Sequence, residues 1–316
     1  MKGLGAIILV FCLLPCALHA YLYDIKALRK WHPEYNRYHY FIGCCDFHDK
    51  THKSNPIQRK RIEELLPSYD PANVLVLVED LSSANDNGRL GCGAYFINSR
   101  IGILAGLGNY CKECRIPVQN VEYRYCRVVA LGPVINNISS DPGAFPSTQR
   151  MTVAHLMQEI EQTYNDLLFS SMTNSFKSQF MEKSASVNKT MERLNLMNNH
   201  QKSIAEYLAS TTTPLNRLEV VKNLLTFDGI LIGFKLVDYT IKALEKEKII
   251  AFAGGTHINE AYDLLQKIDS WEPVTHAELS TIKASVARGI GGAHITERHA
   301  KPEPISLELI DHYLKN

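Results

Sequence analysis

Four residues with acid or imidazole side chains follow an apolar run near the start of the chain. In the stretch YFIGCCDFHDKTHKSN, Asp46, His48, Asp49 and His52 stand close together. Carboxylates and imidazoles transfer protons or hold divalent metal ions. Aspartates also close turns and cap helices, so a polar loop rich in histidine is the other interpretation. The stretch is either the end of a strand that presents these groups for chemistry or an ordinary polar loop.

Two further apolar runs end in similar groups. The run NVLVLVED carries Glu79 at its end, and KIIAFAGGTH carries His257 after two glycines. A continuous apolar run of this length is typical of a strand that is buried on both faces of a parallel sheet. The carboxyl ends of parallel strands lie along one edge, where ligands bind. We therefore expect His48, Glu79 and His257 to converge there, with Asp46 beside them.

This set of side chains would suit metal-assisted or acid–base hydrolysis. Two imidazoles and a carboxylate can hold one divalent ion, such as zinc, manganese or cobalt, and leave a position for water. Such an ion lowers the pKa of its water from about 15.7 toward about 7. We expect His48, His257, Glu79 and His52 as metal ligands, with Asp46 as a catalytic acid or base. A His–Glu pair that works without metal is the alternative, and helix capping or a structural ion pair would explain the same residues without any chemistry.

The stretch NVEYR supplies two more candidates. If it is a strand, Glu122 and Arg124 share one face. Such a pair within a sheet is more often structural, but Arg124 could bind a carboxylate or phosphate of a substrate. We include both residues among the catalytic candidates, with Glu79 and Asp46.

The order of these motifs resembles that of one protein superfamily. CDFH, VLVLVED and GGTH are similar to the strand-acid-x-His, strand-Glu and strand-Gly-x-x-His elements of the superfamily that groups Tiki and TraB proteins, ChaN-type haem-binding lipoproteins and erythromycin esterases. Asp46 stands where glutamate is commoner, and HDKTH resembles the histidine-rich turn of the ChaN-type branch. The resemblance implies an α/β domain whose polar site contains His48, Glu79 and His257, in some members a metal-dependent hydrolase.

The elements that position these residues predict an α/β fold, with a mainly parallel sheet flanked by helices and a large helical insertion. We expect strands over residues 38–44, 73–80, 94–107, 121–132 and 249–253, and a helix that begins near Pro56. Residues 150–248 are the helical insertion, in which residues 174–213 could be helical hairpins or a mobile segment. Residues 21–149 and 249–316 form the α/β domain. The helix and strand signals weaken after Trp271, and the glycine- and proline-marked residues 289–304 are expected to be a loop or loose tail.

The first residues predict where the protein goes. Residues 1–20 have the layout of a secretory signal peptide, with Lys2, an apolar core and a small-residue exit at Ala20. The apolar run is shorter than the roughly 20 residues that span a bilayer, which disfavours a membrane anchor. We expect an exported protein, periplasmic or secreted, without stable membrane insertion after cleavage. Because 34 basic residues balance 33 acidic ones without a basic stripe, nucleic acid is not an expected partner.

Cysteine usage agrees with export. Six of the eight cysteines lie beyond the predicted cleavage site: Cys44, Cys45, Cys92, Cys111, Cys114 and Cys126. An even number in an exported protein favours disulfide bonds. The motif CKEC could instead be a redox pair or half of a zinc site, and Cys44 or Cys45 could be a nucleophile, but bridging fits export better.

The main expectation is an exported hydrolase, with or without a metal ion, that acts on an ester or peptide bond of a small-molecule or peptide substrate. The alternative is a non-catalytic exported protein that binds haem, a metal or a host molecule. The tyrosines and histidines of WHPEYNRYHYF would suit haem. A third possibility is that the site has decayed and that the helical region binds a partner.

Overall fold

A computed structural model gives the architecture of the protein. It describes residues 20–48, 55–80, 104–122, 152–155, 157–158, 161, 165, 174–193, 195, 197–210, 232–274 and 304–315. The strands are β1 (Ala20–His32), β2 (Arg37–His48), β3 (Val74–Val78), β4 (Val118–Asn120), β5 (Lys248–Gly254) and β6 (Glu272–Pro273). The helices are α1 (Asn55–Leu65), α2 (Leu107–Glu113), α7 (Asn174–Arg193), α8 (Ile204–Ser210), α10 (Gly255–Asp269) and α12 (Leu307–Lys315), with another helix over residues 232–242.

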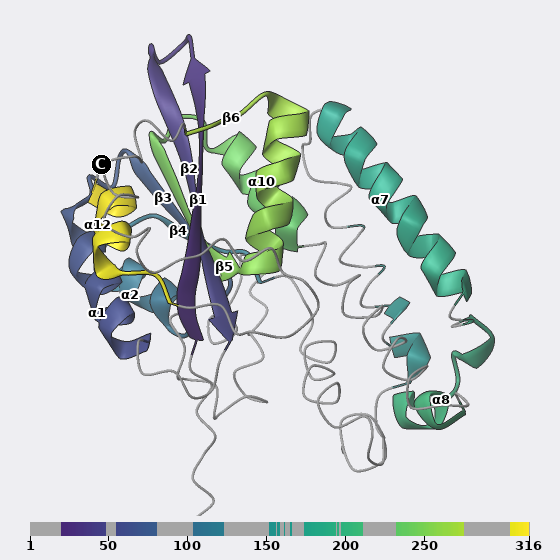
Figure 1. The fold of residues 1–316 in the computed structure, drawn as a ribbon. Helices are drawn as coiled ribbons and strands as arrows, with labels where there is room; N and C mark the ends of the chain where they lie inside the picture. The colour runs from purple at the N-terminus through teal and green to yellow at the C-terminus, as the bar shows by residue number, and fades with distance from the viewer. Residues whose placement is uncertain are drawn as a thin grey trace, which may run out of the picture.

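The described strands form one mixed sheet in the order β4-β3-β5-β2-β1-β6. Strands β4, β3, β5 and β2 are parallel, whereas β1 runs antiparallel to both β2 and β6. Helices cover both faces: α1, α2 and α12 lie on one side, and α7, α8 and α10 lie on the other (Figure 1). The predicted α/β fold with a mainly parallel sheet is confirmed.

Alternation along the central strands divides the core into two layers. In β3, Leu75 and Leu77 face the layer under α10, while Val76 faces the layer under α1. In β5, Ala251 and Phe252 divide in the same way, and all these side chains are buried. Because successive side chains of a strand point to opposite faces, a strand that is covered on both sides must be apolar throughout. This is why the runs VLVLV and IIAFA could be recognised in the sequence.

Helix α10 packs unusually close to β2, because the facing residue is Gly43. A Cβ at Gly43 would collide with Cγ2 of Ile258, whose side chain is fully buried. Phe41 and Cys45 flank this glycine on the same face of β2 and belong to the same apolar cluster as Ile258. The missing side chain therefore sets the distance between the sheet and the helix that carries His257.

The helical region packs on the same layer. Phe176 and Phe180 of α7 make edge-to-face contacts with Phe234, with ring centroids 5.3 and 5.1 Å apart. All three belong to the apolar cluster between α10 and the sheet, and so do Ile204 and Leu208 of α8. Within residues 150–248 the structure describes α7, α8 and the helix over residues 232–242, and these helices share a core with the sheet.

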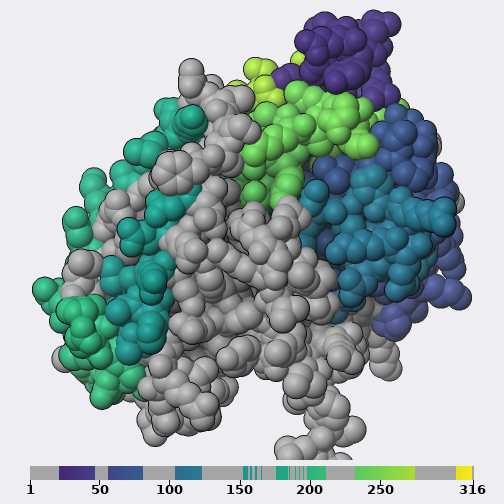
Figure 2. Space-filling view, turned by 180° about the vertical axis from the view of Figure 1, so that it is seen from behind, coloured from purple at the N-terminus to yellow at the C-terminus, as the bar shows by residue number. Residues whose placement is uncertain are grey.

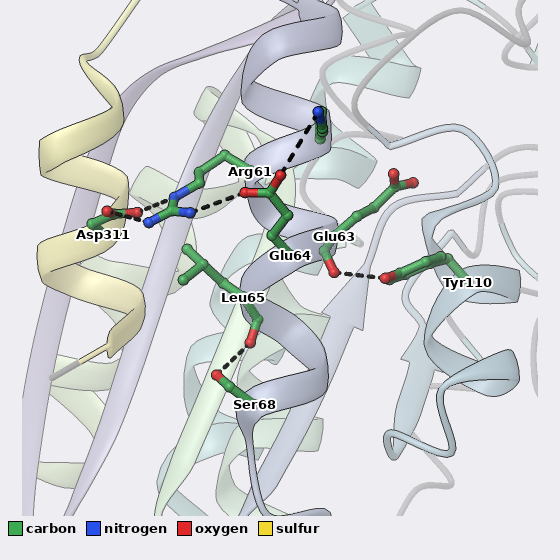
Figure 3. A network of polar contacts seen from close by, with 8 residues as sticks. Arg61, Glu63, Glu64, Leu65, Ser68, Tyr110 and Asp311 are labelled. Atoms are coloured by element: carbon green, nitrogen blue, oxygen red, sulfur yellow. Dashed lines mark hydrogen bonds and ion pairs between the residues drawn. The ribbon is translucent and has the colours of Figure 1, made fainter.

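Helix α12 closes the other layer, and the sequence analysis had assigned no helix to this part of the chain, whereas residues 289–303 of the expected loop lie outside the described residues. Arg61 of α1 makes a two-pronged ion pair with Asp311 of α12, with both N–O distances 2.5 Å, and also contacts Glu64 (Figure 3). Ile310 and Leu314 of the same helix are buried in the apolar cluster of this layer. Their i, i+4 spacing is that of an amphipathic helix, a signal that the sequence carried and the prediction missed.

Strand β1 was also missed, since only residues 38–44 were expected as the first strand. Its apolar residues Leu22, Ile25 and Leu28 are three apart, which looks helical rather than alternating. A bulge between Leu22 and Asp24 shifts the register, and Ile25 and Leu28 face opposite layers of the core. A long strand that contributes side chains to both layers and contains a bulge does not keep a regular alternation of apolar and polar residues.

Two other expected strands are described only at one end. Val121 and Glu122, the first residues of the strand expected over 121–132, follow strand β4 at residues 118–120 and are not part of it. Leu107, the last residue of the expected strand 94–107, begins α2 instead, and Gly106 before it has a positive φ of 70°. Residues 94–103 and 123–132 lie outside the described part.

Replacing Gly43 with alanine should lower the free energy of unfolding by about 1–3 kcal/mol, because the new methyl group overpacks the interface with α10. Urea unfolding followed by circular dichroism measures this change. An Ile258→Ala replacement removes the opposing methyl group, so the double variant should lose less than the sum of the two single variants. Strict additivity would contradict the close packing of α10 on β2.

His39 predicts how stability depends on pH. It is fully buried, and burial lowers its pKa; the charges of His32 and Arg37 also lower it, while the carbonyl of Lys246 and the carboxylate of Glu247 raise it. The unfolded chain therefore binds more protons once the pH falls below about 6.5. Stability should fall as the pH drops through this value and level off below the lowered native pKa. A His39→Gln variant should show a weaker fall in urea-unfolding midpoint between about pH 8 and pH 5; an unchanged fall would contradict the assignment.

Candidate functional site

Five acidic or imidazole side chains gather where the parallel strands end. Asp46 forms the last residue pair between β2 and β5, where it lies directly opposite Gly254. Glu79 and Asp80 follow β3, Glu122 follows β4, and His257 lies in the first turn of α10. All five side chains are buried. Carboxylates this poorly exposed are costly unless they are bonded, and such concentrations at a sheet edge are typical of functional sites.

Glu79 connects three elements of this edge. Its backbone N–H donates to the carbonyl of Phe252 in β5, at 2.9 Å. Its Oε2 accepts the N–H of Gly254 at 2.8 Å, and its Oε1 lies 3.7 Å from Nε2 of His257. The carboxylate therefore lies at the N-terminus of α10, where the helix dipole favours negative charge. It also lies beside Nε2 of His257, so it favours one orientation of this imidazole ring.

Gly255 allows a further side chain to reach this point. A Cβ at Gly255 would collide with the hydroxyl oxygen of Tyr23. Tyr23 lies at the bulge of β1, where the register shifts between Leu22 and Asp24. Burial, helped by the charges of Cys45, Asp24 and Asp46, raises the pKa of Tyr23 to about 12. Its hydroxyl stays protonated even in alkaline solution, and it can donate a hydrogen bond beside the start of α10.

Asn120 joins the ends of β3 and β4. Its side-chain Nδ2 donates to the carbonyl of Asp80 at 2.8 Å, and its Oδ1 accepts the N–H groups of Asp80 and Glu122 at 3.1 and 3.0 Å. Both acids are thereby held in place by their backbones, with their side chains buried at the edge. Asn120 has the role of a scaffold for the acidic rim rather than of a reacting group.

Four of the predicted site residues are placed at the edge: Asp46, Glu79, Glu122 and His257. His48 ends β2 and pairs with Ala20 of β1 through the backbone, but its side chain is not described. His52 and Arg124 lie outside the described residues. Tyr23 and Asn120 were missed, because their positions depend on a bulge and on a cross-strand contact that no motif reveals.

The predicted metal site depends on residues that the structure does not describe. Within the described part of the chain, no three histidine, cysteine or acidic side chains form a group that could hold a metal ion. His257 and Glu79 contact each other, so they could contribute two ligands at most. Binding of a divalent ion therefore remains a prediction that requires His48 or His52.

The described cysteines are free thiols: Cys44, Cys45, Cys111 and Cys114. Burial raises the pKa of Cys45 and of Cys111 to about 12, and raises that of Cys44 as well. Thiols with such raised pKa values are weak nucleophiles, which disfavours the alternative of a cysteine nucleophile at Cys44 or Cys45. A disulfide bond remains a prediction for Cys92 and Cys126, which lie outside the described residues.

The fold and this edge define the class of the protein: an α/β protein with a buried acidic and imidazole site at the carboxyl ends of its parallel strands. The chain matches no protein-family model, no curated protein and no solved structure. Its function is therefore inferred from the chemistry of the site itself.

Tyr23 and Gly255 supply a test of this geometry. Gly255→Ala should lower the free energy of unfolding by about 1–3 kcal/mol, because its methyl group strikes the Tyr23 side chain. Tyr23→Phe alone should cost about 0.5–1.5 kcal/mol through the loss of a hydroxyl contact. The double variant should be more stable than the sum of the two changes predicts, because the hydroxyl oxygen is the atom that the methyl group meets first. Urea unfolding of the four proteins measures the coupling, and a coupling of zero would place Tyr23 elsewhere.

Proposed function

We propose that the protein is a hydrolase of ester or peptide bonds in which His257 is the general base. The observation that carries the proposal is the contact between His257 and Glu79 at the edge of the sheet, with Nε2 and Oε1 3.7 Å apart. Such a distance is within ion-pair range but is longer than a hydrogen bond. Glu79 therefore acts by orienting the imidazole and by stabilising the positive charge that it gains on taking a proton.

The surrounding groups supply what a hydrolytic step needs. His257 takes a proton from water, the water oxygen attacks the carbonyl carbon, and the proton is returned to the leaving group as the ester or peptide bond breaks. Negative charge develops on the carbonyl oxygen. The hydroxyl of Tyr23 and the N–H groups of the first turn of α10 could stabilise that charge.

A metal-dependent form of the same proposal uses the predicted residues His48 and His52. Together with His257 and Glu79 they would hold zinc, manganese or cobalt, which supplies hydroxide at neutral pH when bound. Asp46 and Glu122, both buried at the edge, would then accept a proton or position the substrate. Arg124 keeps its proposed role in binding a substrate carboxylate or phosphate.

Export to the periplasm or out of the cell remains part of the proposal. Residues 1–20 supply the signal-like segment, and the expected cleavage after Ala20 would leave Tyr21 at the start of the chain, within β1 and fully buried. No helix in the described part of the chain is long and apolar enough to cross a membrane.

The experiment compares His257→Ala and Glu79→Gln with a matched control, His200→Ala, which removes an exposed imidazole from the helical region. Hydrolysis of a panel of p-nitrophenyl esters and of a peptide mixture should fall by about a hundredfold or more in the first two variants, because general-base catalysis contributes at least that much. The control should keep full activity. Circular dichroism verifies that all variants are folded.

Three outcomes separate the forms of the proposal. Loss of activity with a chelator, and loss of bound metal in His48→Ala and His257→Ala, would establish the metal-dependent form. Activity that survives the chelator would establish acid–base hydrolysis. Equal activity in wild type, His257→Ala and Glu79→Gln would rule out a hydrolase at this edge, and a haem absorbance band after addition of haemin would then favour the binding protein.

A further inference from the structure

The end of the β1–β2 hairpin extends beyond the rest of the sheet. Strand β2 pairs with β5 only from Tyr40 onward, and β6 pairs with β1 only at Leu28 and Arg29. In the sheet ladder, residues 30–39 therefore pair only with each other, through a turn in which Asn36 has a positive φ. Side chains still join the hairpin to the body, since the guanidinium of Arg37 donates to the carbonyl of Glu245 at 2.7 Å. Figures 1 and 2 show this tip standing out from the body of the molecule.

Aromatic side chains are concentrated on this tip. Trp31 is 46% exposed, Tyr35 44% and Tyr38 37%; the other exposed large apolar side chains of the described part are Ile57 on α1 and Met181 on α7. The ring of Trp31 meets the edge of Tyr38, with centroids 5.1 Å apart. Three of the five exposed apolar side chains thus occupy one short hairpin end, although a soluble monomer normally scatters them.

Cations accompany the rings. The guanidinium of Arg29 lies 4.9 Å from the centre of the Tyr38 ring, and that of Arg37 lies 5.7 Å from the Tyr35 ring. Residues 29–40 contain three cationic side chains and one acid, Glu34. At the base of the hairpin, Lys30 pairs with Asp269 at 2.5 Å, and this pair ties the tip to α10.

We propose that this tip, defined as residues 29–40, docks on the surface of an anionic phospholipid bilayer. Tryptophan and tyrosine have an apolar ring and a polar end, and they favour the level of the lipid headgroups. Lys30 and Arg37 have acidic partners in Asp269 and Glu247, so the guanidinium of Arg29 is the main cation of the tip that complements anionic headgroups. The stretch contains no leucine, isoleucine, valine or phenylalanine, so its chemistry suits the interface rather than the hydrocarbon interior.

The shape of the tip also favours a bilayer over a protein partner. A stable protein interface takes about 800 Å² from each partner, over a broad surface. The exposed turn of this two-stranded tip, with Trp31, Tyr35 and Tyr38 around it, offers a narrow, convex contact (Figure 2). Such a contact suits partial insertion among headgroups. It keeps the protein peripheral to the membrane, and it is independent of the hydrolase proposed at the opposite end of β2.

The chain offers a built-in reporter for this contact. Its two tryptophans are Trp31, on the tip, and Trp271, which is 2% exposed. In a Trp271→Phe variant of the protein without residues 1–20, the emission comes from Trp31 alone. Adding vesicles of phosphatidylcholine and phosphatidylglycerol should shift this emission to shorter wavelength and protect it from a soluble quencher. Unchanged emission would overturn the proposal.

Vesicle sedimentation of variants that keep Trp271 provides a second measurement. The double variant Trp31→Ala, Tyr38→Ala should bind the same vesicles about tenfold more weakly or worse, since it removes the main interfacial side chains. The matched control, Ile57→Ala with Met181→Ala, removes comparably exposed apolar side chains from two helices and should bind like wild type. Equal binding by all three proteins would overturn the proposal.

The remaining outcomes also decide against a bilayer. A dimer in analytical ultracentrifugation without lipid that dissociates in Trp31→Ala, Tyr38→Ala would assign the tip to a second copy of the chain. Binding to insoluble polysaccharide that the same variant loses, without vesicle binding, would assign it to a glycan.

Discussion

The functional edge depends on one buried carboxylate, that of Glu79. A carboxylate removed from water loses several kcal/mol of hydration unless donors replace the water. Here the N–H of Gly254 is such a donor, the N-terminus of α10 adds its dipole, and His257 stands on the remaining side. Glu79 thus fixes how β3, β5 and α10 meet. The same contacts that make its burial tolerable also bring an imidazole to the rim of the sheet.

Close packing beneath the rim depends on two glycines. Gly43 lets Ile258 of α10 rest directly on β2, and Gly255 leaves room for the hydroxyl of Tyr23. A side chain at either position would lift the start of α10 away from the strands. Because His257 lies between Gly255 and Ile258 in sequence, both contacts determine where its ring lies relative to Glu79. Close approach of the backbone at these two glycines is therefore one of the constraints that build the site.

The sequence predicts the centre of the sheet well and its margins poorly. Strands β3 and β5 are buried on both faces, so their apolar runs identify them without ambiguity. From those runs, the convergence of Asp46, Glu79 and His257 at one edge follows from parallel topology alone. Strand β1 escapes prediction because its bulge breaks the alternation, and Tyr23 escapes with it. Local periodicity predicts which face of its own strand a residue occupies, but it does not predict which side chains of a distant strand lie beside that residue.

Strand β1 explains why the two ends of the sheet differ. Its bulge is stabilised by Gln58 of α1, whose Oε1 accepts the N–H of Leu22 at 2.9 Å and whose Nε2 donates to the carbonyls of Leu22 and Ile305. This replacement for ladder bonds allows Tyr23 to turn toward α10 at the rim. The rest of β1 pairs with β2 and extends past the ends of β5 and β6. Trp31 therefore lies beyond the part of the sheet that those strands form. An antiparallel strand added to a parallel sheet thus contributes to the buried polar edge at one end and creates an exposed aromatic end at the other.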